Sequence, residues 1–92
     1  MPLKIVPSNK FIKDIAKAKK RGFDMTLLDE VVTKLANQEK LEPKYRDHQL
    51  SGSLYDFREC HIKPDWLLIY SVDGDELELF LFRTGTHSDL FG

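Results

Sequence analysis

The 92-residue sequence predicts an α+β fold in which a helical hairpin packs on one face of a mainly antiparallel sheet. Three observations lead to this fold class. The first half of the chain repeats apolar side chains with helical spacing, and three later stretches have the composition of strands. The length allows one domain with one core, which we place at residues 1–92. The expected element order is therefore β-α-α-β-β-β.

The first half predicts a short strand followed by two helices. Residues 3–5 alternate apolar and charged side chains, as a strand does. Ser8 can cap a helix whose apolar stripe covers residues 11–16, and Gly22 follows where a C-cap glycine would end it. Asp24 can cap a second helix. Its apolar side chains recur at i, i+3, i+4 and i+7, namely Leu28, Val31, Val32 and Leu35. Few residues separate the helices, so we expect an antiparallel hairpin.

The second half predicts a loop and three strands. Helical and strand periodicity both disappear from Gln38 to Ser53, which indicates a loop. The strands are expected at Leu54–Ile62, Trp66–Val72 and Glu76–Thr84. Between the last two, Asp73-Gly74 is a two-residue hairpin signal, because glycine accepts the positive φ angle that such turns require.

Composition limits the compartment and the partners. The single cysteine, Cys60, excludes an internal disulfide, and the N-terminus lacks the apolar stretch of a signal peptide. No apolar run approaches the roughly 20 residues of a membrane span, so we expect a cytoplasmic protein that does not contact membranes. The net charge of −1 conceals a basic segment that ends at Gly22 and has seven cations and one acid. Such a segment can mark a polyanionic partner, but a solvated lysine-rich helix face explains it equally well.

The three histidines are the first candidates for chemistry. His48, His61 and His87 lie on different predicted elements, so only folding can bring them together, and scattered surface histidines are the alternative. Histidine is the side chain best suited to proton transfer near neutral pH. Because alternate residues of a strand share a face, Glu59 and His61 point one way and Cys60 the other. This alternation argues against a Cys–His nucleophilic pair.

Other site chemistries find little support in the sequence. It has no short-spaced pair of metal ligands, no Gly-x-Ser-x-Gly elbow and no glycine-rich phosphate loop. We therefore expect neither a metal nor another cofactor. An arginine, several histidines and carboxylates remain, and this set suits metal-free cleavage of RNA by attack of the 2′-hydroxyl on the adjacent phosphorus.

The C-terminal stretch supplies groups for that reaction. Arg83 can hold a phosphate through its planar donor fork, and Phe91 can stack on a splayed base. Strand alternation predicts that Arg83 lies on the same side as Leu79 and Leu81. We expect His87 to be the general acid, with His48 or His61 as the base.

Three motifs of the second half resemble those of YafQ-type toxins in the RelE/ParE superfamily. They are RDHQLSG at residues 46–52, RECHIKPDW with LIY at residues 58–66 and 68–70, and RTGTHSDLFG at residues 83–92. The first half agrees with that family in layout. The resemblance implies a RelE-like fold and a bacterial type II toxin that enters the ribosomal A site and cuts the mRNA there. It also implies a cognate antitoxin that holds the toxin inactive.

The resemblance also assigns site residues. The family's functional positions correspond to His48, Glu59, His61, Asp65, Arg83, His87 and Phe91. Asp65 is expected to orient an imidazole, and Glu59 stands where the best-known relatives carry aspartate, so its carboxylate reaches one methylene further. The first helix would then face ribosomal RNA through Lys10, Lys13, Lys17 and Lys20.

Two other functions fit the same resemblance. A non-enzymatic ParE-like toxin would bind DNA gyrase, and a bare binding module would dock an antitoxin and help to repress an operon. Some superfamily branches that act on gyrase carry few histidines. The three histidines of this chain therefore favour RNA cleavage.

Overall fold

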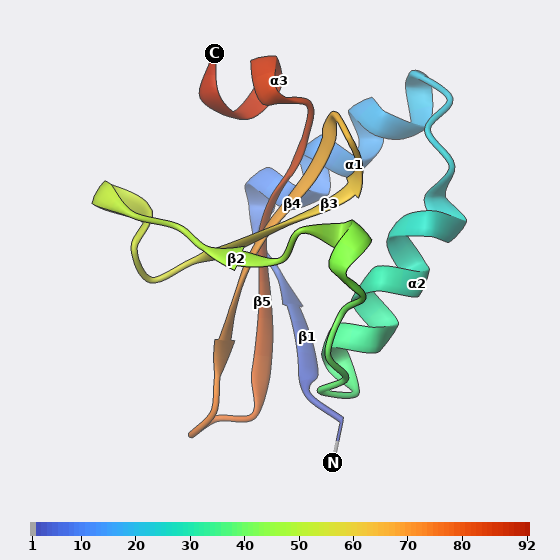
Figure 1. Cartoon of the computed structure of the whole chain (residues 1–92). Coiled ribbons are helices and arrows are strands. Elements are labelled where there is room, and N and C mark those ends of the chain that lie inside the picture. Colours follow the sequence, from blue (N-terminus) through green and yellow to red (C-terminus); the bar gives the residue numbers. More distant parts are fainter. Residues whose placement is uncertain (1) are drawn as a thin grey trace.

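The computed structural model describes residues 2–92 and confirms the predicted α+β fold (Figure 1). Its elements are β1 (Lys4–Pro7), α1 (Asn9–Lys20), α2 (Met25–Ala36), β2 (His48–Gln49), β3 (Arg58–Lys63), β4 (Trp66–Asp73), β5 (Glu78–Gly85) and α3 (His87–Phe91). Two short 3₁₀ turns, η1 (Pro43–Tyr45) and η2 (Gly52–Leu54), flank β2. Within the described residues the strands form one sheet in the order β1-β5-β4-β3-β2. Strand β1 runs parallel to β5, and the other neighbours are antiparallel.

The two long helices begin at the predicted caps. The Ser8 hydroxyl accepts the N–H of Phe11 at 2.9 Å and donates to the carbonyl of Phe82 at 2.6 Å. One serine thus starts α1 and also fastens it to β5. Asp24 caps α2 by accepting the N–H of Thr26. Between the helices, Gly22 adopts the left-handed conformation, with φ of 81°.

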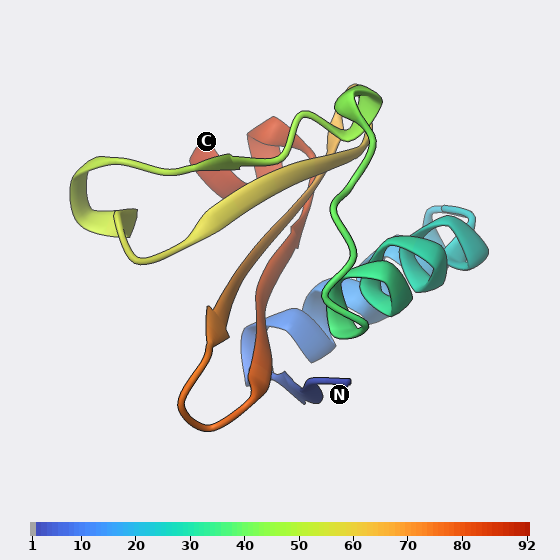
Figure 2. The same ribbon diagram turned by 60° about the horizontal axis from the view of Figure 1, so that its bottom comes forward.

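The core lies between the helices and one face of the sheet. Val31 of α2 and Leu79 of β5 are fully excluded from solvent. Cys60 is equally buried in this core, as strand alternation predicts, and burial raises the pKa of its thiol. Figure 2 shows α1 and α2 on one side of the sheet, while the segment of β2 and η2 extends away from them. The opposite face of β3 therefore carries the side chains that do not serve the core.

Three predicted boundaries are wrong. The first of the three later strands begins at Arg58 rather than Leu54, because η2 occupies residues 52–54. Strand β2 lies inside the predicted loop and pairs with β3. The β4–β5 connection has four residues, 74–77, and its positive φ of 54° belongs to Leu77, not to Gly74. The Asp73 carboxylate organises this longer turn by accepting the N–H groups of residues 75 and 76.

A β-bulge in β5 changes the side on which Arg83 lies. Tyr70 of β4 pairs with Leu81, but the next residue, Ile69, pairs with Arg83. One residue of β5 is therefore inserted, and Arg83 shares the face of Ile69 rather than that of Leu81. The prediction that Arg83 lies beside Leu79 and Leu81 is wrong. Since Ile69 also pairs with Glu59, the bulge places Arg83 on the Glu59 face of the sheet.

No helix within residues 2–92 has both the length and the apolar character needed to cross a bilayer.

Candidate active site

The three histidines meet on the sheet face opposite the core. His48 comes from β2, His61 from β3, and His87 from the start of α3. The ring of His61 lies between the other two, with centroids 6.3 Å from His48 and 5.9 Å from His87. Residues that are 39 positions apart in the sequence thus form one row of imidazoles.

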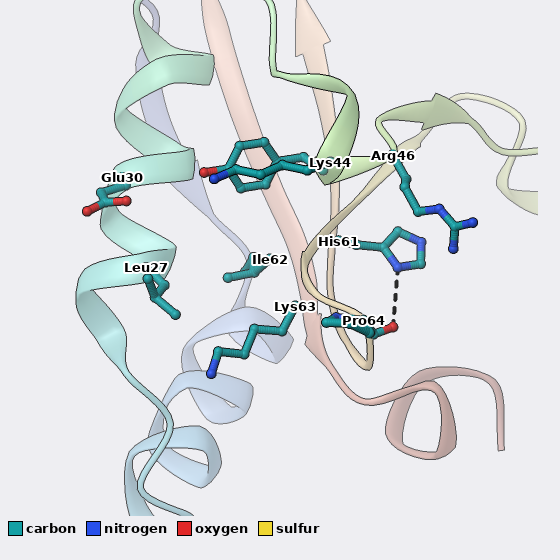
Figure 3. Close-up of a pocket in the computed structure, with 9 residues that line it drawn as sticks. Leu27, Glu30, Lys44, Arg46, His61, Ile62, Lys63 and Pro64 are labelled. Carbon is teal, nitrogen blue, oxygen red and sulfur yellow. Dashed lines mark hydrogen bonds between the residues drawn. The ribbon is translucent and has the colours of Figure 1, made fainter.

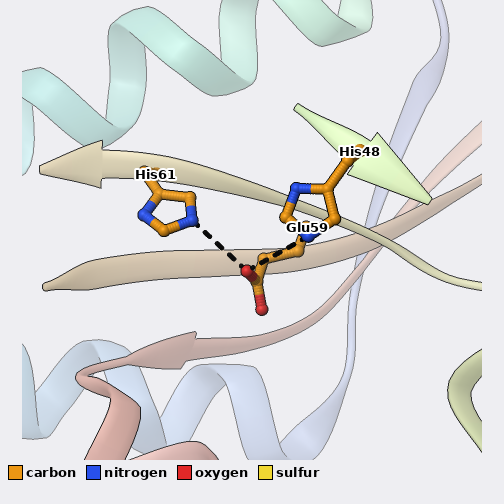
Figure 4. Close-up of side chains that lie close together, drawn as sticks. All are labelled: His48, Glu59 and His61. Atoms are coloured by element: carbon orange, nitrogen blue, oxygen red, sulfur yellow. Dashed lines mark ion pairs between the residues drawn. The ribbon is translucent and has the colours of Figure 1, made fainter. Parts of the chain in front are cut away.

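A buried carboxylate joins two of these rings. Glu59 is only 6% exposed, and its Oε1 lies 3.3 Å from Nε2 of His61 and 3.6 Å from Nε2 of His48 (Figure 4). The register of β2 and β3 places His48 directly opposite Glu59, and strand alternation places His61 beside it. The longer glutamate side chain therefore reaches both rings at once.

Backbone carbonyls set the orientation of the same two rings. Nδ1 of His48 lies 2.7 Å from the Arg46 carbonyl oxygen, and Nδ1 of His61 lies 3.4 Å from that of Pro64. A carbonyl only accepts, so the Nδ1–H of His48 donates to it. Nε2 of neutral His48 then carries a lone pair, which can accept a proton from a substrate.

His87 is held by Asp65 from the β3–β4 turn. Asp65 Oδ1 accepts the backbone N–H of His87 at 2.9 Å and lies 2.5 Å from its Nδ1. These hydrogen bonds, the backbone one first, lower the pKa of the Asp65 carboxyl. Asp65 therefore remains ionised and directs Nε2 of His87 away from itself. The imidazole-orienting role of Asp65 stays a prediction, and the contact with His87 names the ring that it would orient.

Asp89, which sequence reasoning missed, anchors the helix that carries His87. Its carboxylate accepts the N–H of Thr86 at 2.9 Å, and the Thr86 hydroxyl accepts the N–H of Asp89 in return. The same carboxylate lies 2.7 Å from Nη1 of Arg21 and 3.1 Å from Nζ of Lys17, both near the end of α1. A Cβ atom on Gly85 would lie 3.0 Å from Asp89, so glycine gives this carboxylate its room. The spacing Thr86-x-x-Asp89, a capping box, was the available sequence signal.

Arg83 is already occupied by a carboxylate. Its Nε and Nη2 lie 2.7 and 3.1 Å from the two oxygens of Asp14 in α1. Asp14 also accepts the N–H of Thr84 at 3.1 Å, where β5 extends beyond the short β1. The pKa of Arg83 is raised, chiefly by the hydrogen bond to Asp14. Arg83 can therefore hold a phosphate only through its remaining N–H groups or by releasing Asp14.

The four lysines expected to contact ribosomal RNA differ in their surroundings. Lys17 is paired with Asp89, and Nζ of Lys10 lies 5.8 Å from the centroid of the Phe82 ring. Lys13 and Lys20 are exposed and form no ion pair with another described residue. The unoccupied positive charge of α1 is therefore smaller than the sequence count indicates.

Phe91 lies on α3 and leaves half of its surface, 52%, exposed. A closing core residue would be buried, so the exposure favours a role in contacting a base. We expect Phe91→Ala to leave the melting temperature almost unchanged and to cost about 1–3 kcal/mol in mRNA engagement. Thermal unfolding and a cleavage assay over a range of message concentrations measure the two effects. A core truncation of about 3–5 kcal/mol would contradict this expectation.

The row of histidines also has the donors of a metal site. Ligand atoms of His48, Glu59 and His61 lie within 4.8 Å of one another. Both Nδ1 atoms face backbone carbonyls, which is the usual outer contact of a metal-bound histidine. Sequence spacing does not reveal this cluster, because its ligands meet across two paired strands.

Comparisons with known proteins show the family to which this chain belongs. The family described as "Bacterial toxin of type II toxin-antitoxin system, YafQ" matches residues 3–92. The mRNA interferase toxin YafQ of Escherichia coli K12 is 44% identical over 86 residues, which cover 92% of this chain and 91% of the relative.

Two solved structures extend the likeness to the fold. The E. coli DinJ–YafQ toxin–antitoxin complex contains a chain with 40% identity, full coverage of both chains and a TM-score of 0.90. A structure described as a metal-bound toxin from Helicobacter pylori has 54% identity, covers 97% of this chain and 99% of its own, and has a TM-score of 0.91. This chain therefore belongs to the YafQ family of bacterial type II toxin–antitoxin toxins.

Proposed function

We propose that this protein is a cytoplasmic, ribosome-dependent endoribonuclease that cleaves mRNA in the ribosomal A site by metal-free acid–base catalysis. The observation that carries the proposal is the row of three imidazoles, oriented by Glu59 and Asp65 and exposed to solvent at both ends. The name mRNA interferase, carried by the E. coli relative, supports the same reaction class.

His48 is the general base in this proposal. Its Nε2 lone pair removes the proton of a 2′-hydroxyl, and the oxygen attacks the adjacent phosphorus. The new bond joins O2′ to phosphorus, the bond to O5′ breaks, and the products carry a 2′,3′-cyclic phosphate and a 5′-hydroxyl. His61 is the weaker candidate for the base, because its side chain is only 11% exposed, compared with 50% for His48.

His87 is the general acid. Asp65 accepts from Nδ1 of the imidazolium, so the proton on Nε2 is the one that passes to the departing O5′. His61, between the other two rings, donates to a non-bridging oxygen of the phosphate through Nδ1, which must release the Pro64 carbonyl 3.4 Å away, while Nε2 stays beside Glu59. Arg83 adds positive charge at the same face, and Phe91 stacks on a base.

A cognate antitoxin is the proposed protein partner. The E. coli relative is described in complex with the antitoxin DinJ. In this chain, the exposed Lys13 and Lys20 of α1 offer a basic surface to an acidic antitoxin segment. With no antitoxin bound, we propose that Lys10, Lys13, Lys17 and Lys20 contact ribosomal RNA.

Induced expression in bacteria, followed by primer extension on a translated message, tests the proposed function. Discrete cuts aligned to the codon frame are expected. The same protein should cut deproteinised RNA poorly, because the ribosome orients the message for in-line attack, an effect worth several kcal/mol. Efficient cleavage of naked RNA would refute ribosome dependence, and intact mRNA with damaged DNA would indicate action on gyrase instead.

Metal ions provide a second test of the mechanism. Zn²⁺ bound to Nε2 of His48 and His61 would occupy the lone pair that the base needs, so we expect micromolar Zn²⁺ to inhibit cleavage on ribosomes. Protein treated with a chelator and then dialysed should keep full activity. A Helicobacter pylori relative is described as metal-bound, which supports the expectation that this chain can bind a metal ion.

The control for this test is His61→Ala, whose Zn²⁺ affinity is measured by isothermal titration. Loss of affinity in this variant would identify the cluster as the inhibitory site. Loss of activity on chelation, restored by Zn²⁺, would contradict the metal-free mechanism.

A further inference from the structure

The geometry points to a binding cleft for the mRNA backbone beside His61, between α2 and the β3–β4 turn. This cleft takes the phosphodiester and ribose groups of the single strand next to the bond that is cut. The inference rests on the proposed function and adds to it, because the cations involved belong neither to α1 nor to the catalytic row.

The cleft has a volume of about 500 Å³ and lies against the catalytic row. One wall comes from α2, another from η1 and the residue after it, and the third from the end of β3 and its turn (Figure 3). His61 lines this cleft and also contacts Glu59. A strand whose scissile phosphate lies on the row of imidazoles therefore has a neighbouring phosphate at the mouth of the cleft.

Three cations and one carboxylate, that of Glu30, line the cleft, and Nζ of Lys44 lies 5.1 Å from the centroid of the Tyr45 ring. Lys44, Arg46 and Lys63 are exposed, and none forms an ion pair with another described residue. Other basic residues on this side of the protein are already paired: Arg58 with Asp47 and Lys34 with Glu42. The three cations outnumber the one carboxylate, so the cleft has a net positive charge, and a polyanion is the complementary ligand.

Arg46 links the cleft to the catalytic row. Its side chain extends beside His61 (Figure 3), while its backbone carbonyl accepts from Nδ1 of His48. The backbone of Arg46 is left-handed, with φ of 49°, which is uncommon for a residue other than glycine. This conformation directs the carbonyl to one histidine and the guanidinium to the neighbourhood of another. A phosphate bound by Arg46 therefore lies near His48, the proposed general base.

The apolar floor favours a single strand over a duplex. Leu27, Ile62 and Pro64 line the cleft between the cations. Apolar surface of this kind suits a ribose or an unstacked base, whereas duplex RNA offers mainly phosphates and 2′-hydroxyls. The ligand is therefore the message rather than a helix of ribosomal RNA.

The test is fluorescence anisotropy with a labelled single-stranded RNA that is 2′-O-methylated throughout and cannot be cleaved. Binding is measured between 50 and 200 mM salt for the wild type and for Arg46→Ala/Lys63→Ala. The slope of log K against log salt should fall by about 0.7 for each phosphate contact that is lost. The charge-matched control is Lys4→Ala/Lys19→Ala, outside the cleft, and its slope should equal that of the wild type. Equal slopes for all three proteins would overturn the inference.

Two further measurements, one with a single variant and one with a duplex RNA, test whether the effect belongs to the cleft and to single-stranded RNA. Lys63→Ala alone leaves the Arg46 backbone undisturbed and should lose one contact, even if the double variant folds poorly. A duplex RNA of the same length, as a substitute for ribosomal RNA, should bind the cleft variant and the control equally well. An equal loss for duplex and single strand would mean a ribosomal docking surface and would refute the assignment to mRNA.

The binding assay does not depend on catalysis, so the two proposals can fail separately. If the wild type makes no cuts on ribosomes, the proposed function fails whatever the slopes are. If the wild type cuts and the cleft variant both cuts and binds like it, only the cleft inference fails.

Discussion

Replacement of His87 by alanine should abolish growth inhibition and lower the rate of mRNA cleavage on ribosomes by about 10²–10⁴-fold. The physical reason is the loss of the only imidazole whose Nδ1 is held by a carboxylate within the described residues, and with it the proton for the leaving O5′. Single-turnover cleavage of a programmed ribosome measures the effect.

The fold should survive this substitution. The His87 side chain is 54% exposed and its contact with Asp65 is a solvent-exposed surface pair, which contributes little to the stability of the fold. Ser88→Ala, one residue along the same helix and also exposed, is the matched control and should remain toxic. A well-folded His87→Ala protein that still inhibits growth would remove α3 from the mechanism.

Replacement of Asp89 by alanine should have the next largest effect, on rate and stability together. It removes half of the capping box of α3 and both ion pairs to α1. A lost cap costs about 1 kcal/mol, and the exposed ion pairs add at most about 1 kcal/mol each. His87 is the first residue of α3, so it moves when this helix moves. A displacement of its imidazole by about 1 Å can lower the cleavage rate by about 10²-fold.

The pH dependence of stability separates the ion pairs of Asp89 with Lys17 and Arg21 from its capping hydrogen bonds. Hydrogen bonds, first from Arg21, hold the pKa of Asp89 well below its usual range. Stabilisation by a lowered pKa is fully present above the unfolded value of about 3.9 and is lost as the pH falls toward the folded value. The melting-temperature difference between the wild type and Asp89→Ala should thus be constant above about pH 5 and shrink below pH 4.

Two variants complete the experiment. Asp89→Asn keeps an oxygen that can accept the N–H of Thr86 but removes the charge, so it separates the cap from the ion pairs. Asp56→Ala, at an exposed position, is the control and should change neither the rate nor the melting temperature. If Asp89→Ala lowers stability but leaves the cleavage rate at the wild-type value, Asp89 does not position His87.

Strand alternation and capping rules were sufficient for much of the fold and for part of the site. They place Glu59 and His61 on one face, Cys60 on the other, and the helix starts at Ser8 and Asp24. These are local rules, and they hold because each depends on side chains a few residues apart.

The parts that sequence reasoning missed depend on contacts distant in the chain. A single inserted residue in β5 moved Arg83 to the other face, and no local pattern signals a bulge of this kind. Its partner Asp14 is 69 residues away, and Arg21 is 68 residues from Asp89. The cleft cations Arg46 and Lys63 come together only when η1 packs beside the end of β3. The sequence therefore predicts a basic surface on the first helix, where its cations are concentrated, and not at this cleft.

The parallel pairing of β1 with β5 has a consequence for synthesis of the protein. Residues 4–7 leave the ribosome long before residues 78–81, which are their only strand neighbour in the described sheet. Translation adds about 5–20 residues per second, so the first strand waits for seconds without its partner. The row of three imidazoles forms later still, because His87 belongs to α3, which follows β5 in the chain. Under the proposed function, the nascent chain therefore gains its row of three imidazoles only after nearly all of these 92 residues have emerged.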